Sequence, residues 1–270
     1  MPVAATNTSA NSALFYLNRN SSNQEAALNR ISSGTRITNS ADDTAGLAIS
    51  DQLQSDIIAL EQAAITTQQV ESLLQIADGG LARVGDILQR MKALTVQDNS
   101  GTVDATSQGF IATEYLALAN QIDTVAAATD YNGTALIVGG AATVVVVGVN
   151  ATDTITLGLN TINVSQAGLG YTANLAGAAA PADITAADNA INALGGFRST
   201  IGSLTSRIQF QGENIQTQLT NIKEAKSAIF DSDIALEQSN FTNFQVLTEA
   251  AIASLSQANQ AKQSLLSLLR

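Results

Sequence analysis

The hydrophobic positions between residues 42 and 97 recur at alternating steps of three and four residues. They are Ile57, Leu60, Ala64, Thr67, Val70, Leu74, Ala77, Leu81, Val84, Leu88, Met91 and Leu94, and no proline interrupts them. This spacing predicts one apolar face on a long amphipathic helix or coiled-coil strand. Such a helix would be about 80 Å long, whereas a compact globule of this chain length would be about 40–50 Å across. We therefore expect an elongated molecule.

The second half of the chain repeats this pattern. After Pro181, with Asp183 or Thr185 as its cap, a helix is predicted from the positions Ile191, Leu194, Ile201, Leu204, Ile208, Ile215, Leu219, Ile222 and Ile229. A shorter helix follows residues 231–233, with one apolar side formed by Phe244, Leu247, Ala251, Leu255, Ala258, Leu265 and Leu269. In the first half, a polar turn at 97–110 and a further helix at 111–128 follow the long helix.

The middle of the chain has a different pattern. Asn132-Gly133 is a turn signal, and residues 143–147 and 154–157 are rich in Val, Ile and Thr, which predicts a β-hairpin. A Gly- and Ala-rich loop is expected at 168–180. The predicted fold is mainly α, an elongated rod of long antiparallel helices or coiled coil, with a small β-hairpin region at about 131–175.

Both ends of the chain contain few charged residues. Residues 1–41 carry Arg19, Glu25, Arg30 and Arg36, and residues 234–270 carry Glu237, Glu249, Lys262 and Arg270. A helix that faces water normally has a charged outer face. We therefore predict that these segments pack among other helices in an assembly. The alternative is a pair of weakly ordered tails, and both hold if the ends become ordered on assembly.

The composition excludes several kinds of site. The chain has no Cys, His or Trp, so it can form no disulfide, no thiolate or imidazole centre and no His/Cys metal site. We predict a protein that is not an enzyme and has no cofactor. The net charge of −11 argues against nucleic acid as a binding partner, because its phosphate backbone is also negatively charged. No apolar run approaches the roughly 20 residues of a membrane span, and the N-terminus lacks the pattern of a cleaved signal peptide.

Several short motifs stand out along the chain. ISSGTRI at 31–37 and SADDTAGLAIS at 40–50 are similar to the N-terminal signature of bacterial flagellins, and SQANQ at 256–260 and LLSLLR at 265–270 are similar to the C-terminus of that family. RSTIG at 198–202, IFDSD at 229–233, the turn at 131–133 and the hairpin at 149–156 match as well. The resemblance covers nearly the whole chain, and both terminal signatures lie at the expected ends.

The resemblance implies a subunit that polymerises through its terminal helices into the flagellar filament for swimming motility. Residues 1–41 plus 234–270 would form the inner filament core domain, and 42–233 the rod domain, with the outer variable domain absent or minimal. The residues assigned to assembly are Leu14, Leu17, Leu28, Ile31, Phe244, Leu247, Leu255, Leu265 and Leu269. The implied partners are further copies of the chain, an export chaperone, the type III export apparatus, the filament cap and hook-associated proteins. The implied location is the extracellular filament, reached without a cleaved signal peptide.

A surface patch resembles the one that toll-like receptor five recognises on flagellins. It consists of Gln89, Arg90, Leu94 and Glu114, with Ala93 where the family pattern has glutamate. The same residues are first a candidate protofilament contact.

Asp42-Asp43 is interpreted as a helix start, and Arg36 as one partner of a salt bridge. The alternatives are a hook–filament junction protein or a flagellin-like adhesin that binds polysaccharide. A metalloprotease insert would require histidines that this chain lacks.

Overall fold

The computed structural model describes residues 7–139, 143–171, 175 and 181–268. The elements are α1 (Thr8–Ser33), α2 (Thr44–Asp98), α3 (Ala105–Ala128), β1 (Asp130–Tyr131), β2 (Thr134–Ala135), β3 (Thr143–Val146), β4 (Thr154–Leu157), a 3-10 helix (Gly158–Thr161), α4 (Gln166–Leu169), α5 (Pro181–Phe230) and α6 (Ile234–Leu268). The fold is mainly α, as predicted. The chain divides into two compact units, unit 1 (Met1–Ser55 with Asn221–Arg270) and unit 2 (Asp56–Thr220).

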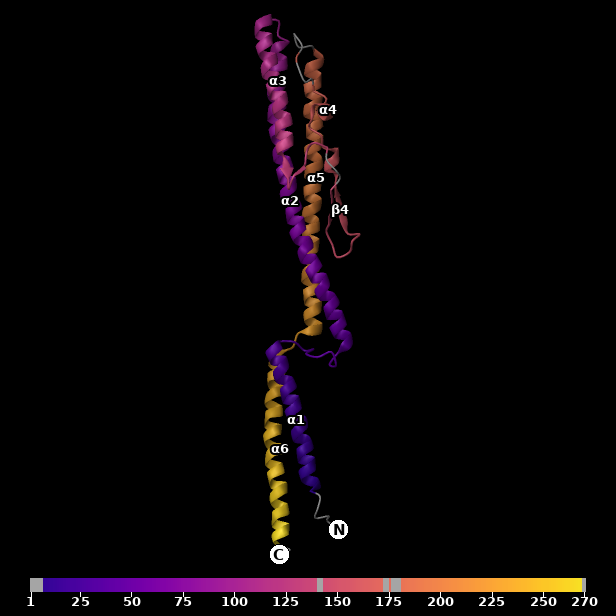
Figure 1. The fold of residues 1–270 in the computed structure, drawn as a ribbon, viewed down its shortest axis with the longest axis vertical. Helices are drawn as coiled ribbons and strands as arrows, with labels where there is room; N and C mark the ends of the chain where they lie inside the picture. Colours follow the sequence, from indigo (N-terminus) through magenta and orange to yellow (C-terminus); the bar gives the residue numbers. More distant parts are fainter. Residues whose placement is uncertain (1–6, 140–142, 172–174, 176–180, 269–270) are drawn as a thin grey trace. The chain divides into compact units, whose positions relative to one another are not determined.

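In unit 2, α2 and α5 bury the apolar faces that the sequence predicts. Of the twelve periodic positions of the long N-terminal helix, eleven are buried and Ala64 is half-buried. On α5 the positions from Leu194 to Leu219 are buried as well. Arg198 of α5 and Asp78 of α2 form a two-point ion pair, with Nε–Oδ1 at 2.9 Å and Nη2–Oδ2 at 3.2 Å. The apolar faces and this pair together hold the two helices side by side (Figure 1).

The third helix of unit 2 begins earlier than predicted. The Asp104 carboxylate accepts a hydrogen bond from the backbone N–H of Ser107, so α3 starts at Ala105 and the turn before it is shorter than 97–110. Hydrogen bonding from the Ser107 side chain, and to a smaller extent from its backbone N–H, holds the pKa of Asp104 below its usual value. At its other end, Thr129 comes close to Gly80 of α2, where an added Cβ would lie 2.6 Å from the Thr129 Oγ1. Glycine is required at this helix–helix approach.

The β structure of unit 2 consists of two antiparallel pairs. Asn132 and Gly133, with φ of 51° and 76°, form the turn between β1 and β2, as the Asn-Gly signal predicts. Strands β3 and β4 pair from Thr143↔Leu157 to Val146↔Thr154, which confirms the predicted hairpin. The hairpin lies beside α5 (Figure 1), where the Gln211 side-chain amide donates to the Val147 carbonyl at 3.1 Å. Most of the predicted loop at 168–180 lies outside the described residues.

One predicted helix cap is wrong. The C-terminal long helix begins at Pro181, so Asp183 lies in its first turn and neither Asp183 nor Thr185 is the cap. Proline suits the first helical position because the N–H that it lacks would have no partner inside the helix there. Asp183 still fits the first turn, because a carboxylate there is favoured by the helix dipole.

Candidate assembly interface

Unit 1 pairs α1 with α6 in antiparallel orientation (Figure 1). The Asn7 side-chain amide donates to the Ala258 carbonyl at 3.2 Å near one end, and Arg30 pairs with Glu237 near the other, with Nη1–Oε1 at 3.4 Å. Along α1 the buried and half-buried positions include Ala10, Ala13, Leu17, Asn20, Gln24, Ala27 and Ile31. Along α6 they include Glu237, Phe241, Phe244, Thr248, Ala251, Leu255, Ala258 and Lys262. Both sets follow the steps of four and three that characterise a coiled coil.

This seam buries small and polar side chains, half-buries five large apolar ones and leaves others exposed. Its fully buried members are three alanines, Asn20 and Glu237. Among the described side chains of the two helices, the exposed large apolar ones are Leu14, Phe15, Tyr16, Leu28, Ile234, Leu236, Val246, Leu247 and Ile252. Phe15 is 63% exposed and Leu236 is 59% exposed. Extended apolar surfaces of this kind mark sites of protein–protein contact. We call this set of nine residues the outer apolar surface.

The structure divides the predicted assembly residues between the seam and the outer apolar surface. Leu17, Ile31, Phe244 and Leu255 are half-buried in the seam, whereas Leu14, Leu28 and Leu247 are exposed. The prediction of a single apolar side on α6 is wrong at Leu247, because Thr248 takes the seam position. The side chain of Leu265 and all of Leu269 lie outside the described residues.

Hydrogen bonds join the linker between α1 and α2 (residues 34–43) to the region between α5 and α6 (residues 231–233) and the end of α5. Gly34, with φ of 73°, ends α1 and accepts a hydrogen bond from the Ser232 N–H at 3.0 Å. Arg36 donates its backbone N–H to the Phe230 carbonyl at 2.7 Å and its Nη2 to the Ile229 carbonyl at 2.7 Å. Among the described residues Arg36 has no ion pair. Its guanidinium instead binds a carbonyl in the last turn of α5, where helix carbonyls lack partners.

Asp42 and Asp43 organise the start of α2, as predicted. The Asp43 Oδ1 accepts the Gly46 N–H at 2.8 Å, which caps the helix. The Asp42 carboxylate accepts hydrogen bonds from Asn39 and Thr38, and these bonds lower the pKa of Asp42. On α6, Asp233 caps the first turn through the Ala235 and Leu236 N–H groups. All three carboxylates therefore have structural partners.

The predicted receptor patch lies in unit 2, where α2 and α3 meet. Arg90 and Glu114 pair, with Nη2–Oε1 at 2.6 Å and Nε–Oε1 at 2.9 Å, and Gln89 is exposed beside them. Leu94 is only 1% exposed. Its side chain therefore packs inside unit 2, and the surface of the patch consists of Gln89, Arg90 and Glu114.

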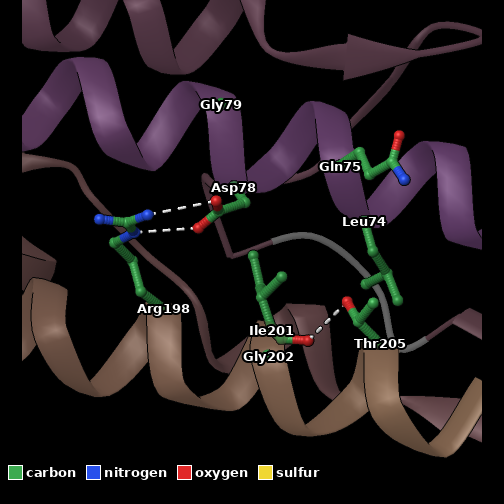
Figure 2. A pocket seen from close by; sticks show the side chains of 8 residues that line it. All are labelled: Leu74, Gln75, Asp78, Gly79, Arg198, Ile201, Gly202 and Thr205. Atoms are coloured by element: carbon green, nitrogen blue, oxygen red, sulfur yellow. Dashed lines mark hydrogen bonds and ion pairs between the residues drawn. The ribbon is translucent and has the colours of Figure 1, made fainter.

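A groove with a volume of about 580 Å³ runs between α2 and α5 of unit 2 (Figure 2). Leu74, Gly79, Ile201 and Gly202 contribute to its lining, and the Arg198–Asp78 pair spans it. The Thr205 hydroxyl donates to the Ile201 carbonyl of its own helix. Both charges are paired and this hydroxyl serves its own backbone, so the lining presents no reactive group. Within the described ranges, no group of acidic side chains could hold a metal ion, and no helix has the length and apolarity to cross a bilayer.

Comparisons with known proteins identify the family from both halves of the chain. The model of the bacterial flagellin N-terminal helical region matches residues 5–142, and that of the C-terminal helical region matches residues 184–269. The chain belongs to the bacterial flagellin family. This is a family of structural proteins.

Relatives extend over nearly the full length of this flagellin. It is 36% identical to the flagellin of Bacillus subtilis (strain 168), over 96% of this chain and 97% of the relative. It is 31% identical to the flagellar filament 33 kDa core protein of Treponema phagedenis, over 90% of this chain and 91% of the relative. The crystal structure of Bacillus cereus flagellin is 30% identical and covers 59% of this chain and 93% of that chain, with a TM-score of 0.47.

Proposed function

We propose that this flagellin polymerises through α1 and α6 into the tubular filament of the bacterial flagellum, as its structural subunit for swimming motility. One observation carries the assignment of the interface. The α1–α6 pair buries alanines in its seam and exposes nine large apolar side chains. A pair built in this way gains most of its apolar burial from neighbouring subunits.

This division of residues accounts for growth by addition of subunits. A subunit that meets a growing end covers its outer apolar surface, whereas an isolated subunit leaves that surface in water. The contact joins different surfaces of neighbouring copies, and such contacts build an open helical polymer when their rotation does not close a ring. We infer that residues 1–41 and 234–270 form the inner core of the filament and that residues 42–233 form the surrounding rod.

Polymerisation of the purified protein tests this function. We expect long filaments by electron microscopy after seeding with filament fragments or addition of salt, and persistent monomers or short caps would contradict the proposal.

Filaments sheared from cells extend the test to export. We propose that the chain leaves the cell without a cleaved signal peptide, through the type III apparatus with a chaperone, and adds below a filament cap beyond hook-associated proteins. The N-terminal sequence of sheared subunits should then begin at residue 1 or 2.

We further propose that toll-like receptor five binds the patch of Gln89, Arg90 and Glu114 on the monomer. The support is the exposure of these three residues and the Arg90–Glu114 ion pair that the patch presents. Titration of the receptor ectodomain with monomer should show weaker binding for Arg90→Ala than for the control Arg83→Ala. Arg83 is an exposed arginine of α2 that lies about two helical turns from Arg90. Equal binding by the two variants would remove Arg90 from the receptor site.

A further inference from the structure

Unit 2 carries most of the negative charge of this flagellin. Residues 56–220 contain fourteen Asp and Glu and five Lys and Arg, so unit 2 has nine of the eleven net negative charges. Two copies of unit 2 that approach each other therefore repel, most strongly at low salt. A filament that brings these units into contact needs cations placed where the copies meet.

Four of the five basic residues of unit 2 are paired within the chain. The pairs are Arg83–Asp86, Arg90–Glu114, Lys92–Asp188 and Arg198–Asp78. In the part of the chain that the structure describes, Arg207 is the remaining cation of unit 2, and its exposed guanidinium has no ion pair or hydrogen bond. It is free to bind a carboxylate outside the chain.

Phe210 lies one helical turn beyond Arg207 on the same side of α5. Its side chain is 71% exposed. The buried positions of this segment, Ile201, Leu204, Ile208 and Ile215, lie on the opposite side of the helix. The exposed residues around the pair include the small polar residues Ser203, Ser206, Asn214 and Thr217, and Glu213 adds one exposed carboxylate at the edge of this group. We call Arg207, Phe210 and the four small polar residues the outer face of α5.

We propose that the outer face of α5 binds unit 2 of a second copy of this chain, with the Arg207 guanidinium paired to a carboxylate of that copy and the Phe210 ring buried beside it. The inference rests on the proposed filament function and identifies one of its contacts outside the terminal helices. Charge complementarity selects the occupant, because a second copy of unit 2 presents a strongly acidic surface to a cation that has no partner in its own chain. Aromatic residues, phenylalanine included, and arginine are also enriched at protein–protein interfaces.

Critical concentrations for seeded growth test the contact. We expect Arg207→Glu and Phe210→Ser each to raise the critical concentration about tenfold or more, and Arg207→Lys to stay near wild type. The matched control is Arg83→Glu, which makes the same charge change at an exposed arginine of α2. Circular dichroism of the monomers should show unchanged helix content. A loss of filament growth then reflects loss of the contact between copies and not unfolding of the monomer.

A photoreactive phenylalanine analogue at position 210 provides the direct readout. We expect irradiated filaments to yield covalent dimers and irradiated monomers to yield none. If the wild-type chain fails to polymerise, the proposed function fails. If wild type polymerises while Arg207→Glu and Phe210→Ser grow as well as Arg83→Glu, or filaments yield no crosslink, the contact is refuted and the function stands.

Discussion

The double variant Phe15→Gln, Leu28→Gln should lose filament growth while its monomer remains folded. Both side chains belong to the outer apolar surface of α1, with exposed fractions of 63% and 51%. Covering them against neighbouring subunits is worth about 2–4 kcal/mol in total, at 25 cal/mol per Å² of apolar area. The critical concentration should therefore rise by about 30-fold to 1,000-fold, which sedimentation of polymer at a series of concentrations measures directly. Glutamine forms helices well, so α1 keeps its conformation.

The control for this variant is Phe110→Gln in unit 2. Phe110 is 72% exposed, more than Phe15, but it lies on α3 and outside the terminal helices. The comparison separates a requirement for the outer apolar surface of unit 1 from a general effect of removing exposed phenylalanine. Equal growth of the double variant and wild type would show that the outer apolar surface of α1 is not needed for assembly and that α1 acts only through its seam with α6. A loss as severe for Phe110→Gln would place the decisive contact in unit 2.

The helices of unit 2 could be predicted because each buries a single apolar face against a partner in the same chain. From Ile57 to Leu94 all but one of the periodic residues are buried, since α5 supplies the other half of the core. The hairpin could also be predicted, because Asn132-Gly133 and the Val- and Thr-rich segments each have few alternative conformations. The early start of α3 had a signal in Asp104, an N-cap residue three positions before Ser107.

The arrangement of α1 and α6 was harder to predict, because each helix has two apolar sides. Periodicity identifies both sides and does not tell which one meets the partner in the same chain. The prediction therefore placed Leu247 on one apolar side with Phe244 and Ala251, whereas the structure exposes Leu247 and half-buries Thr248 in the seam. Arg36 posed a similar problem, since a guanidinium in a linker is suited equally to a carboxylate and to the free carbonyls at a helix end. Its contact with Ile229 depends on two segments almost two hundred residues apart.

The polar members of the seam suggest how α1 and α6 find their alignment. Alanines spaced by seven residues or multiples of seven fit a neighbouring helix in several registers, so they specify the alignment weakly. Arg30 and Glu237 can meet in only one of these registers. The Glu237 side chain is 11% exposed and that of Arg30 is 33% exposed, so a shifted alignment would leave one charge in the seam without its counter-ion.

Replacing Glu237 with alanine should weaken the filament more than replacing any other acidic residue of α6. The Arg30 Nε is already buried without a hydrogen-bond partner among the described residues, so the guanidinium depends on Glu237 for its neutralisation. Loss of that partner should cost about 1–3 kcal/mol per subunit, below the value for a fully buried pair because Arg30 is partly hydrated. The temperature at which filaments dissociate should fall, and the critical concentration should rise about 5-fold to 100-fold.

Two further variants separate pairing from helix stability. Glu249→Ala makes the same substitution at an exposed position of α6 and should leave the filament near wild type. The exchange Arg30→Glu with Glu237→Arg restores opposite charges across the seam and should recover most of the lost stability, although each single exchange places like charges together. If Glu237→Ala is no worse than Glu249→Ala, or the exchange recovers nothing, the seam charges do not set the alignment. If the double exchange restores filament stability and neither single exchange does, a single ion pair selects how the terminal helices align before neighbouring subunits cover them.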